Sequence, residues 1–356
     1  MTTPEPERTA IDPGPSDPGR SGLSRDTLGS IGEIAALRRI FPRLPHSESA
    51  LLGPGDDAAI LAAPDGRYVV TTDMMVHGPD FRWAWSTPGD LGWKAAASNL
   101  ADVAAMGARP TALLVAIAAS SDTPVAVLEG IADGLRAGCE ALAPGCGVVG
   151  GDLSVSDVFT IAVTAFGDLQ GAVPVLRSGA RAGDVIAVAG ALGLAARGLH
   201  ELFEYGVDEN GVPDSTRSAA LRDLPHVRAQ LRPSPPIASG VEAARAGATA
   251  MLDLSDGLAL DAGRVASASG VALDLDSEAV RQLAGSAADA QTALTGGEDH
   301  SLLATFPPEA VLPLAFRRIG SVRPGTGLLL DGAPYVPAGE RGAGWDPYAG
   351  WDGAAG

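Results

Sequence analysis

The chain has 356 residues, enough for two domains with a large buried core. Its formal net charge of −18 argues against nucleic acid as a partner, because neutralising a phosphate backbone requires clustered Lys and Arg. It has two cysteines but no CxxC pair, which argues against structural zinc. It has no apolar run of about 20 residues, which argues against a membrane span, and no signal-peptide pattern, which favours a cytoplasmic protein.

Residues 1–27 are rich in Pro, Ser, Gly, Asp and Arg without hydrophobic periodicity, so we expect a disordered tail. Order is expected to begin where Ser30 and Glu33 form a capping-box pattern in front of apolar residues at helical spacing. In the middle of the chain the pattern of strands and helices starts again. We therefore expect an N-terminal domain over residues 28–172 and a C-terminal domain over residues 173–356.

Strands and helices alternate and are interrupted by paired strands, which predicts an α+β or α/β fold. Helices are expected over residues 30–41, 90–106, 124–141, 194–205 and 258–269. Strands are expected over residues 53–63, 67–72, 111–119, 146–150, 158–166, 184–189, 250–254, 271–276 and 301–306. A polar loop is expected over residues 206–217, and Asp90 is expected to cap the second helix.

Seven aspartates follow a strand, a glycine pair or a helical face, positions that fix the backbone around them. They are Asp56, Asp57, Asp73, Asp102, Asp152, Asp253 and Asp256. A single surface aspartate usually lies in a solvated loop, but converging acids repel each other, by about 4 kcal/mol per pair at about 4 Å and an effective dielectric of 20. Carboxylate oxygens without His or Cys suit Mg²⁺, which relieves this repulsion. We therefore expect several Mg²⁺ ions shared with a polyphosphate.

Two glycine pairs and one lysine fit a phosphate site. Gly150-Gly151 and Gly296-Gly297 let backbone amides approach a phosphate closely, although each pair alone more often marks a turn. Lys94, the only lysine in the sequence, shares a helical face with Asp102 and is a candidate phosphate contact. The chain has no Walker A sequence, nucleophile elbow or protein-kinase triplet, and its five histidines lie in contexts that suggest no general base.

Six motifs occur in one order along the chain. They are DDAA from residue 56, TTDM from 71, KAAASNLADVAAMG from 94, GGD from 150, DLSDG from 253 and LTGGED from 294. Over about residues 29 to 350 this set resembles thiamine-monophosphate kinases, members of the aminoimidazole ribonucleotide synthetase-like superfamily of ATP-binding proteins. The resemblance implies phosphoryl transfer from ATP to thiamine monophosphate, and we expect this transfer to be direct and in line, without a phosphoenzyme.

The resemblance also implies an N-terminal domain that binds ATP and Mg²⁺ and pairs its strands across a homodimer into an intersubunit β-barrel. A C-terminal α/β domain would close over the substrate. The implied magnesium ligands are Asp57, Thr71, Thr72, Asp73, Asp102, Asp152, Asp253 and Asp256. The implied ATP contacts are Gly151, Arg177 and Ser255, and the implied thiamine contacts are Glu298 and Trp345. Asp57, Asp152 and Asp256 are expected to be catalytic.

Three positions depart from the pattern of this family. Asp80 stands where the family usually has His, and it would place a carboxylate near the cationic thiazolium of the substrate. Leu153-Ser-Val155 replaces Thr-Thr-Arg after the Gly-Gly-Asp motif, on the ATP side. His300-Ser301 replaces Tyr-Glu after the Gly-Gly-Glu-Asp motif, while the acids before it are retained.

Two alternatives stay open beside the kinase. A sister synthetase of the superfamily would use ATP to activate an amide or carbonyl oxygen, and a non-catalytic acid-rich protein would bind metal without ATP turnover. The Met106-Gly107 pattern and the terminal Trp-Asp segment favour the kinase. A selenophosphate synthetase would require a reactive residue such as Cys near the N-terminus, and none occurs before Cys139.

Overall fold

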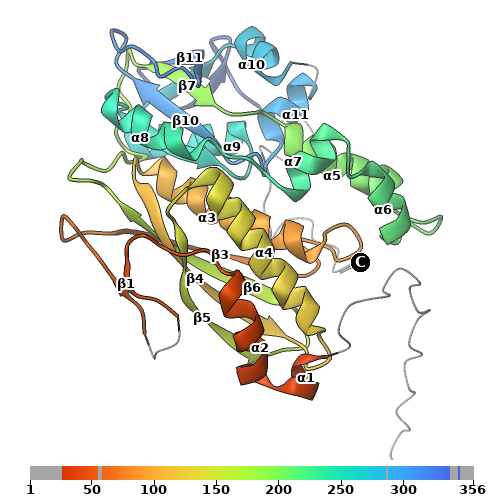
Figure 1. Cartoon of the computed structure of the whole chain (residues 1–356). Coiled ribbons are helices and arrows are strands. Elements are labelled where there is room, and N and C mark those ends of the chain that lie inside the picture. Colours follow the sequence, from red (N-terminus) through yellow and green to blue (C-terminus); the bar gives the residue numbers. More distant parts are fainter. Residues whose placement is uncertain (1–25, 55–57, 286–287, 337–343, 345–356) are drawn as a thin grey trace, which may run out of the picture.

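The computed structural model describes residues 26–54, 58–285, 288–336 and 344, which form two main sheets with helices around them (Figure 1). The first half of the chain builds a four-stranded sheet. Its strands lie in the order β3 (Val69–Val76), β6 (Thr160–Asp168), β4 (Arg109–Ala119) and β5 (Gly147–Val155). β4 and β5 run parallel, and the other neighbours are antiparallel. Helix α3 (Pro88–Ala105) packs against β3 and β6, and α4 (Val125–Leu142) packs along α3.

A short helix, α1 (Leu28–Ile31), opens the described part of the chain. Thr27 Oγ1 accepts the N–H of Ser30 at 3.2 Å, and Ser30 Oγ accepts the N–H of Thr27 at 2.8 Å. Gly32, with a φ of 75°, separates α1 from α2 (Glu33–Ile40). The capping box predicted for Ser30 and Glu33 is therefore wrong, because Thr27 supplies the cap. Thr27 was also predicted to belong to the tail, of which residues 1–25 lie outside the described residues.

A 3-10 helix and a small hairpin lead from α2 into the first sheet. They are η1 (Phe41–Arg43), β1 (Ala50–Leu52) and β2 (Ile60–Leu61).

The second half of the chain builds a seven-stranded sheet. Its strands lie in the order β13 (Ala333–Pro334), β12 (Gly327–Leu330), β9 (Ala272–Leu275), β11 (Phe316–Arg323), β7 (Val185–Ala189), β10 (Ser301–Phe306) and β8 (Ala250–Leu254). β12 runs parallel to β9, and the other neighbours are antiparallel. The accompanying helices are α5 (Leu194–Tyr205), α6 (Ser215–Leu221), α7 (Pro225–Leu231), α8 (Ile237–Arg245), α9 (Leu258–Ser269), α10 (Ser277–Ala284) and α11 (Ala290–Thr295). Within the described ranges, no helix is both long and apolar enough to cross a bilayer.

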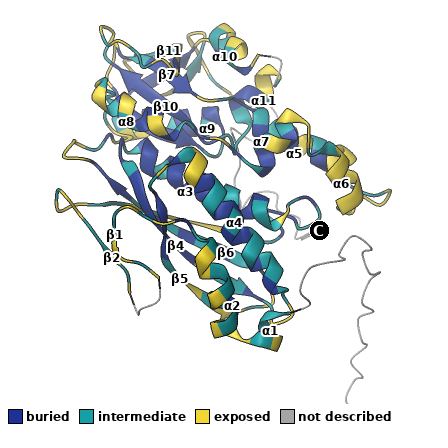
Figure 2. Cartoon of the chain, in the orientation of Figure 1, coloured by how far each residue is buried: buried dark blue, intermediate teal, exposed yellow. Residues whose placement is uncertain are grey.

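Helix α3 is buried along nearly its whole length because it lies between the two halves of the chain (Figure 2). It contacts β3 and β6 of the first half and β8, β10 and α8 of the second half. One apolar core therefore joins Ala101 of α3 to Met251 of β8 and Phe306 of β10. The polar side chains of α3, which include Lys94 and Asp102, are consequently held at the junction of the two halves.

The longer predicted elements are present, but several details differ. β3 extends to Val76 and β5 to Val155, so Asp73 and Asp152 lie inside strands instead of after their ends. The N-cap of α3 is Thr87, and Asp90 is its reciprocal partner three residues further on. The loop predicted over residues 206–217 contains the start of α6. The strand expected over residues 53–63 is limited, among the described residues, to β2. Helices α7, α8, α10 and α11 and strands β1 and β11 to β13 escaped prediction, because short elements give too few periods of a hydrophobic pattern.

Candidate active site

Four aspartates gather at the junction of the two halves, and we call them the acid cluster. Asp73 lies in β3, Asp102 in α3, Asp253 in β8 and Asp256 in the turn between β8 and α9. Asn99 of α3 fixes β3 at this point, because its Oδ1 accepts the backbone N–H of Asp73 at 3.1 Å. The first three acids thus come from three different elements, and α3 is the element that the other two approach.

The acid cluster is more negative than its burial readily tolerates. Burial raises the pKa of Asp102 to about 7, and the charges of Asp253 and Asp73 act in the same direction. A hydrogen bond of 2.8 Å from Thr71 Oγ1 to Asp102 Oδ2 opposes this shift without cancelling it. Burial likewise raises the pKa of Asp73. Such a site favours whatever brings positive charge, either a proton or a cation.

We expect the metal-free protein to lose stability as the pH rises from about 5 to about 8. The pKa of Asp102 in the folded chain, about 7, lies above its ordinary value. The protonated form therefore stabilises the fold at low pH, and this contribution is lost as the carboxyl ionises. Thermal unfolding in EDTA measures it. Because Asp102→Asn removes this titration, the Tm gap between variant and wild type should widen towards pH 8, and a constant gap would contradict the pKa shift.

Arg264 of α9 neutralises one side of the acid cluster. Its Nη1 lies 2.6 Å from an oxygen of Asp256 and 2.6 Å from an oxygen of Asp261. Asp261 is fully buried, accepts the N–H of Asp256 at 3.1 Å, and has its pKa raised by burial to about 6. The sequence analysis missed Asp261 and Arg264. Their spacing of three residues on a predicted helix was the available signal.

A second set of charges lies beside the acid cluster. Lys94 of α3 forms an ion pair with Glu298, and Gln230 Nε2 of α7 donates to the same Glu298 oxygen at 2.8 Å. Burial alone would raise the pKa of Glu298, but the charge and hydrogen bond of Lys94 hold it below its ordinary value. Burial raises the pKa of Asp80 even though the Val76 N–H donates to it at 2.7 Å. Lys94 thus contacts a carboxylate, whereas the sequence predicted a phosphate contact.

His300 belongs to the site, although the sequence analysis found no role for any histidine. Its Nδ1 lies 3.3 Å from Asp253 Oδ2, and only 6% of the residue is exposed. Burial would lower the pKa of His300, but the hydrogen bond and charge of Asp253 raise it above its ordinary value. The neighbouring Asp299 accepts the N–H groups of Leu194 and Ala195 and so caps α5. The position of His300 directly after the Gly-Gly-Glu-Asp motif, residues 296–299, was the signal that could have identified it.

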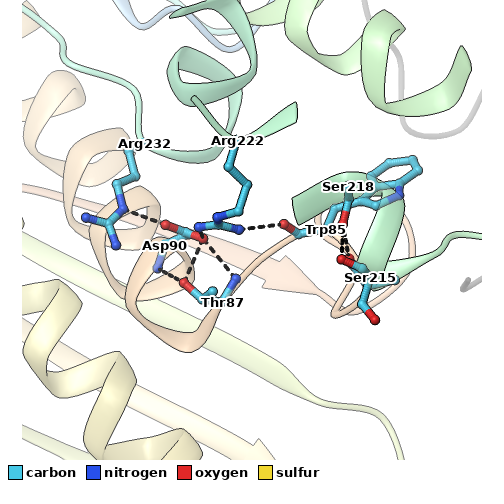
Figure 3. A network of polar contacts seen from close by, with 8 residues as sticks. Trp85, Thr87, Asp90, Ser215, Ser218, Arg222 and Arg232 are labelled. Atoms are coloured by element: carbon cyan, nitrogen blue, oxygen red, sulfur yellow. Dashed lines mark hydrogen bonds and ion pairs between the residues drawn. The ribbon is translucent and has the colours of Figure 1, made fainter. Parts of the chain in front are cut away.

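A buried carboxylate connects α3 to the second half beside this site (Figure 3). Asp90 is 1% exposed and forms ion pairs with Arg222 and Arg232, the latter with Nε 2.5 Å from Oδ1. Burial alone would raise the pKa of Asp90, but hydrogen bonds from Arg222, Thr87 and Arg232 hold it below its ordinary value. Arg222 also donates to the carbonyl of Trp85 at 3.0 Å. The two arginines flank α7, so this network fixes the helix that carries Gln230.

Asp152 lies on the opposite face of the four-stranded sheet from the acid cluster. In the sheet register, Asp152 lies in one row with Ala116 of β4 and Met74 of β3, which is 61% exposed. Asp73 belongs to the adjacent row, and successive strand residues point to opposite faces. Thr72 therefore points to the same face as Asp152. Within this chain the structure does not bring Asp152 or Thr72 to the acid cluster, contrary to the prediction of one shared site.

The remaining predicted site residues lie at different distances from the acid cluster. Ser255 is adjacent, and its carbonyl accepts the N–H of Glu298 at 2.8 Å. The Arg177 carbonyl accepts a hydrogen bond from the hydroxyl of Ser269 at 2.9 Å. Ser269 is the last residue of α9, a 12-residue helix about 18 Å long that begins beside the acid cluster, so Arg177 lies at the far end of this helix. Gly151 precedes Asp152 in β5. Three predicted residues lie outside the described ranges, namely Asp56, Asp57 and Trp345.

The donors of the acid cluster suit a hard cation. Among residues 26–54, 58–285, 288–336 and 344, no group of three or more His, Cys, Asp or Glu side chains is arranged to hold a metal ion by itself. Mg²⁺ usually binds through one or two carboxylates and completes its coordination with water and substrate phosphates. The raised pKa of Asp102 shows that positive charge is favoured here. The cluster therefore fits Mg²⁺ that is shared with a phosphate ligand.

Comparison with known proteins supports a nucleotide-dependent site. Residues 55–169 match the family described as AIR synthase related protein, N-terminal domain. Over 335 residues the chain is 43% identical to a thiamine-monophosphate kinase of Mycobacterium tuberculosis, covering 91% of this chain and 92% of that protein. The crystal structure of thiamine-monophosphate kinase from Stenotrophomonas maltophilia superposes with a TM-score of 0.69 at 31% identity, covering 84% and 97% of the two chains. A structure described as AaThiL complexed with AMPPCP and TMP superposes with a TM-score of 0.67 at 30% identity, covering 90% and 97%.

Proposed function

The chain belongs to the thiamine-monophosphate kinase family, and from this premise we propose that it transfers the terminal phosphoryl group of ATP to thiamine monophosphate. The products are ADP and thiamine diphosphate. The observation that carries the proposal is the acid cluster, in which carboxylates from β3, α3 and β8 meet at the junction of the two halves. A cytoplasmic location, where ATP and Mg²⁺ are available, accords with this activity.

The acceptor in this reaction is itself a phosphate. Its second pKa is about 6, so it is mostly dianionic at neutral pH and needs no strong base. Direct in-line attack on ATP instead requires that two anions be screened and aligned. This requirement accounts for a site that is rich in Asp and in which the buried histidine pairs with an acid.

Several Mg²⁺ ions would supply the missing positive charge between the phosphates and the protein. We assign Asp73, Asp102 and Asp253 to hold them, with Thr71 orienting Asp102 through its 2.8 Å hydrogen bond. Asp57 and Asp256 are further proposed ligands and the proposed catalytic residues, whereas Thr72 and Asp152 face the other side of the sheet and are not assigned to the acid cluster. Gly151, Arg177 and Ser255 are assigned to ATP, and Asp80, Glu298 and Trp345 to the thiamine moiety. Residues 28–172 would bind ATP and dimerise, and residues 173–356 would close over the substrate.

A direct assay tests the proposed function. The protein is incubated with ATP, Mg²⁺ and thiamine monophosphate, and the products are separated by chromatography. We expect thiamine diphosphate and ADP in equal amounts, and none in the presence of EDTA. Nucleotide binding without formation of thiamine diphosphate would overturn the kinase and favour a sister synthetase.

We also propose that the open face of the four-stranded sheet pairs with a second copy of the chain, in the manner of an intersubunit barrel. This face carries exposed apolar side chains, among them Val70 and Met74 of β3. Next to them lies a groove of about 770 Å³, lined by residues such as Leu37, Ala116 and Phe166. A homodimer would cover this apolar surface, and it would enclose Asp152 at the interface.

Met74→Glu should therefore dissociate the dimer, because it places a charge on the apolar face that the proposed interface would bury. Light scattering after size exclusion measures the mass of wild type and variant at the same concentration. Val311→Glu is the matched control, since Val311 is 88% exposed in a loop of the second half. A monomeric wild type, or a Met74→Glu variant that remains dimeric, would contradict the proposed interface.

A further inference from the structure

We propose that Lys94 and Gln230 are positioning residues that hold the carboxylate of Glu298 for the cationic ring of the acceptor, a role that depends on the proposed function. Both side chains donate to the same oxygen, Oε2, with Gln230 Nε2 at 2.8 Å. They come from α3 and α7, while Glu298 precedes β10. Three separate elements thus meet at one carboxylate oxygen.

The backbone of Glu298 is fixed as firmly as its side chain. Its φ of 71° lies in the left-handed region, and its N–H donates to the carbonyl of Ser255 at 2.8 Å. A Cβ on the preceding Gly297 would lie 2.4 Å from that same carbonyl, so only glycine fits at this close approach. Glu298 can therefore neither slide along the chain nor change its side-chain position without breaking several contacts.

The geometry leaves one face of the carboxylate for a ligand. In the part of the chain that the structure describes, the hydrogen bonds to Glu298 end at Oε2, and none is made to Oε1. Lys94 and Gln230 are each only 6% exposed, so neither donor can swing into solvent without leaving the core. A ligand would thus meet Oε1 at a fixed position.

The balance of charge around Glu298 indicates a cationic ligand. A buried ammonium requires a counter-ion, and Glu298 is the partner of Lys94. Asp80 lies close enough for both charges to influence it, and His300 is the other titratable group that acts on Glu298. With Lys94 paired to Glu298, the carboxylate of Asp80 is left in excess. This excess suits a substrate with a fixed positive charge on a heteroaromatic ring and disfavours another phosphate.

Steady-state kinetics test the assignment by varying thiamine monophosphate and ATP separately. Lys94→Met should raise the KM for thiamine monophosphate by about 10-fold or more, the effect of losing a hydrogen bond to a charged group. The KM for ATP should stay within about 2-fold, because a loss of ground-state binding affects only the substrate concerned. Lys94→Arg should restore most of the affinity, and Gln230→Leu should weaken thiamine monophosphate binding in the same sense.

A double-mutant cycle separates positioning from independent effects. If Lys94 acts through Glu298, the variant with both Lys94→Met and Glu298→Gln should be no worse than the poorer single variant. Arg281→Met is the control, because Arg281 pairs with Glu278 on the exposed face of α10. Circular dichroism checks that each variant is folded. If Lys94→Met does not fold, the same kinetic comparison is made with Gln230→Leu.

Two results would overturn the assignment in an active wild type. One is a rise in the KM for ATP, which would make Lys94 the phosphate contact predicted from the sequence. The other is additive effects in the double variant. A wild type that forms no thiamine diphosphate would overturn the proposed function and this role together, so the two failures are distinguishable.

Discussion

Replacing Asp102 by asparagine should reduce kcat by about 100- to 1000-fold, the usual effect of removing one electrostatic contact to the reacting groups. The charges of both Asp253 and Asp73 act on Asp102, so the substitution removes a carboxylate that interacts with two other members of the acid cluster. Asparagine has the same shape and can still accept the hydrogen bond from Thr71. The expected loss therefore reflects the charge and not the packing. Product formation at saturating ATP, Mg²⁺ and thiamine monophosphate measures it.

The same substitution should raise the Tm of the metal-free protein at pH 8. The substitution removes a buried charge next to two others, and this repulsion destabilises the fold when no cation is bound. Asp122→Asn is the matched control, because Asp122 lies exposed in the turn before α4 and should change neither quantity. A kcat within about 3-fold of wild type would remove Asp102 from the mechanism, since electrostatic contacts of this type are worth far more.

Replacing Asp90 by alanine should lower the free energy of unfolding by about 3 to 5 kcal/mol, the cost of breaking a buried ion pair from one side. Asp90 is 1% exposed and serves two arginines, which would be left without their counter-charge. The substitution also removes the Oδ2 that accepts the N–H and the hydroxyl of Thr87 at the start of α3. Because Arg222 and Arg232 retain 29% and 38% exposure, water can partly replace the lost partner, which favours the lower end of this range.

Two further variants test what the charge of Asp90 contributes, apart from its hydrogen bonds to Thr87 at the start of α3. Asp90→Asn keeps an oxygen for the Thr87 N–H but loses the charge, so it should destabilise less than alanine. Glu278→Ala breaks an exposed ion pair with Arg281 and should leave the stability nearly unchanged, because water screens this pair. Urea denaturation compares all three with wild type. If Asp90→Ala behaves like Glu278→Ala, the network in Figure 3 contributes nothing beyond a surface pair.

The sequence predicted the family and most of the long elements because their signals are local or lie in ordered motifs. The helical face that carries Lys94 and Asp102 is visible from spacing alone. The proximity of Asp102 to Asp253 cannot be predicted from spacing, since 151 positions separate them and only the order of the motifs connects them. The arginine partners of Asp90 had no signal at all, because surface arginines and buried counter-ions look alike in a sequence.

Strand register accounts for the largest discrepancy. The sequence grouped Asp152 with the other acids because each follows a strand, a glycine pair or a helical face. β5 continues through Asp152, and the side chains of a strand point alternately to its two faces. A shift of one position along the strand therefore moves a carboxylate from one face of the sheet to the other. The length of a strand beyond a glycine pair depends on its neighbour β4, which supplies the hydrogen bonds for this extension. That information is tertiary and is absent from the local pattern.

Helix α3 has a consequence for the tolerance of the chain to variation. An amphipathic surface helix has a permissive side, where substitutions are accepted at every third or fourth position. α3 has none, since one half of the chain packs on each side and its polar residues are engaged in the site. Larger side chains at its alanines would displace a neighbour, changes at Lys94 or Asp102 would alter the site, and changes at Asp90 would break its ion pairs with Arg222 and Arg232. Random mutagenesis of this helix would therefore find that substitutions reduce activity or stability at almost every position. The usual pattern, in which every third or fourth position of a surface helix is exposed and tolerates substitution, would be absent.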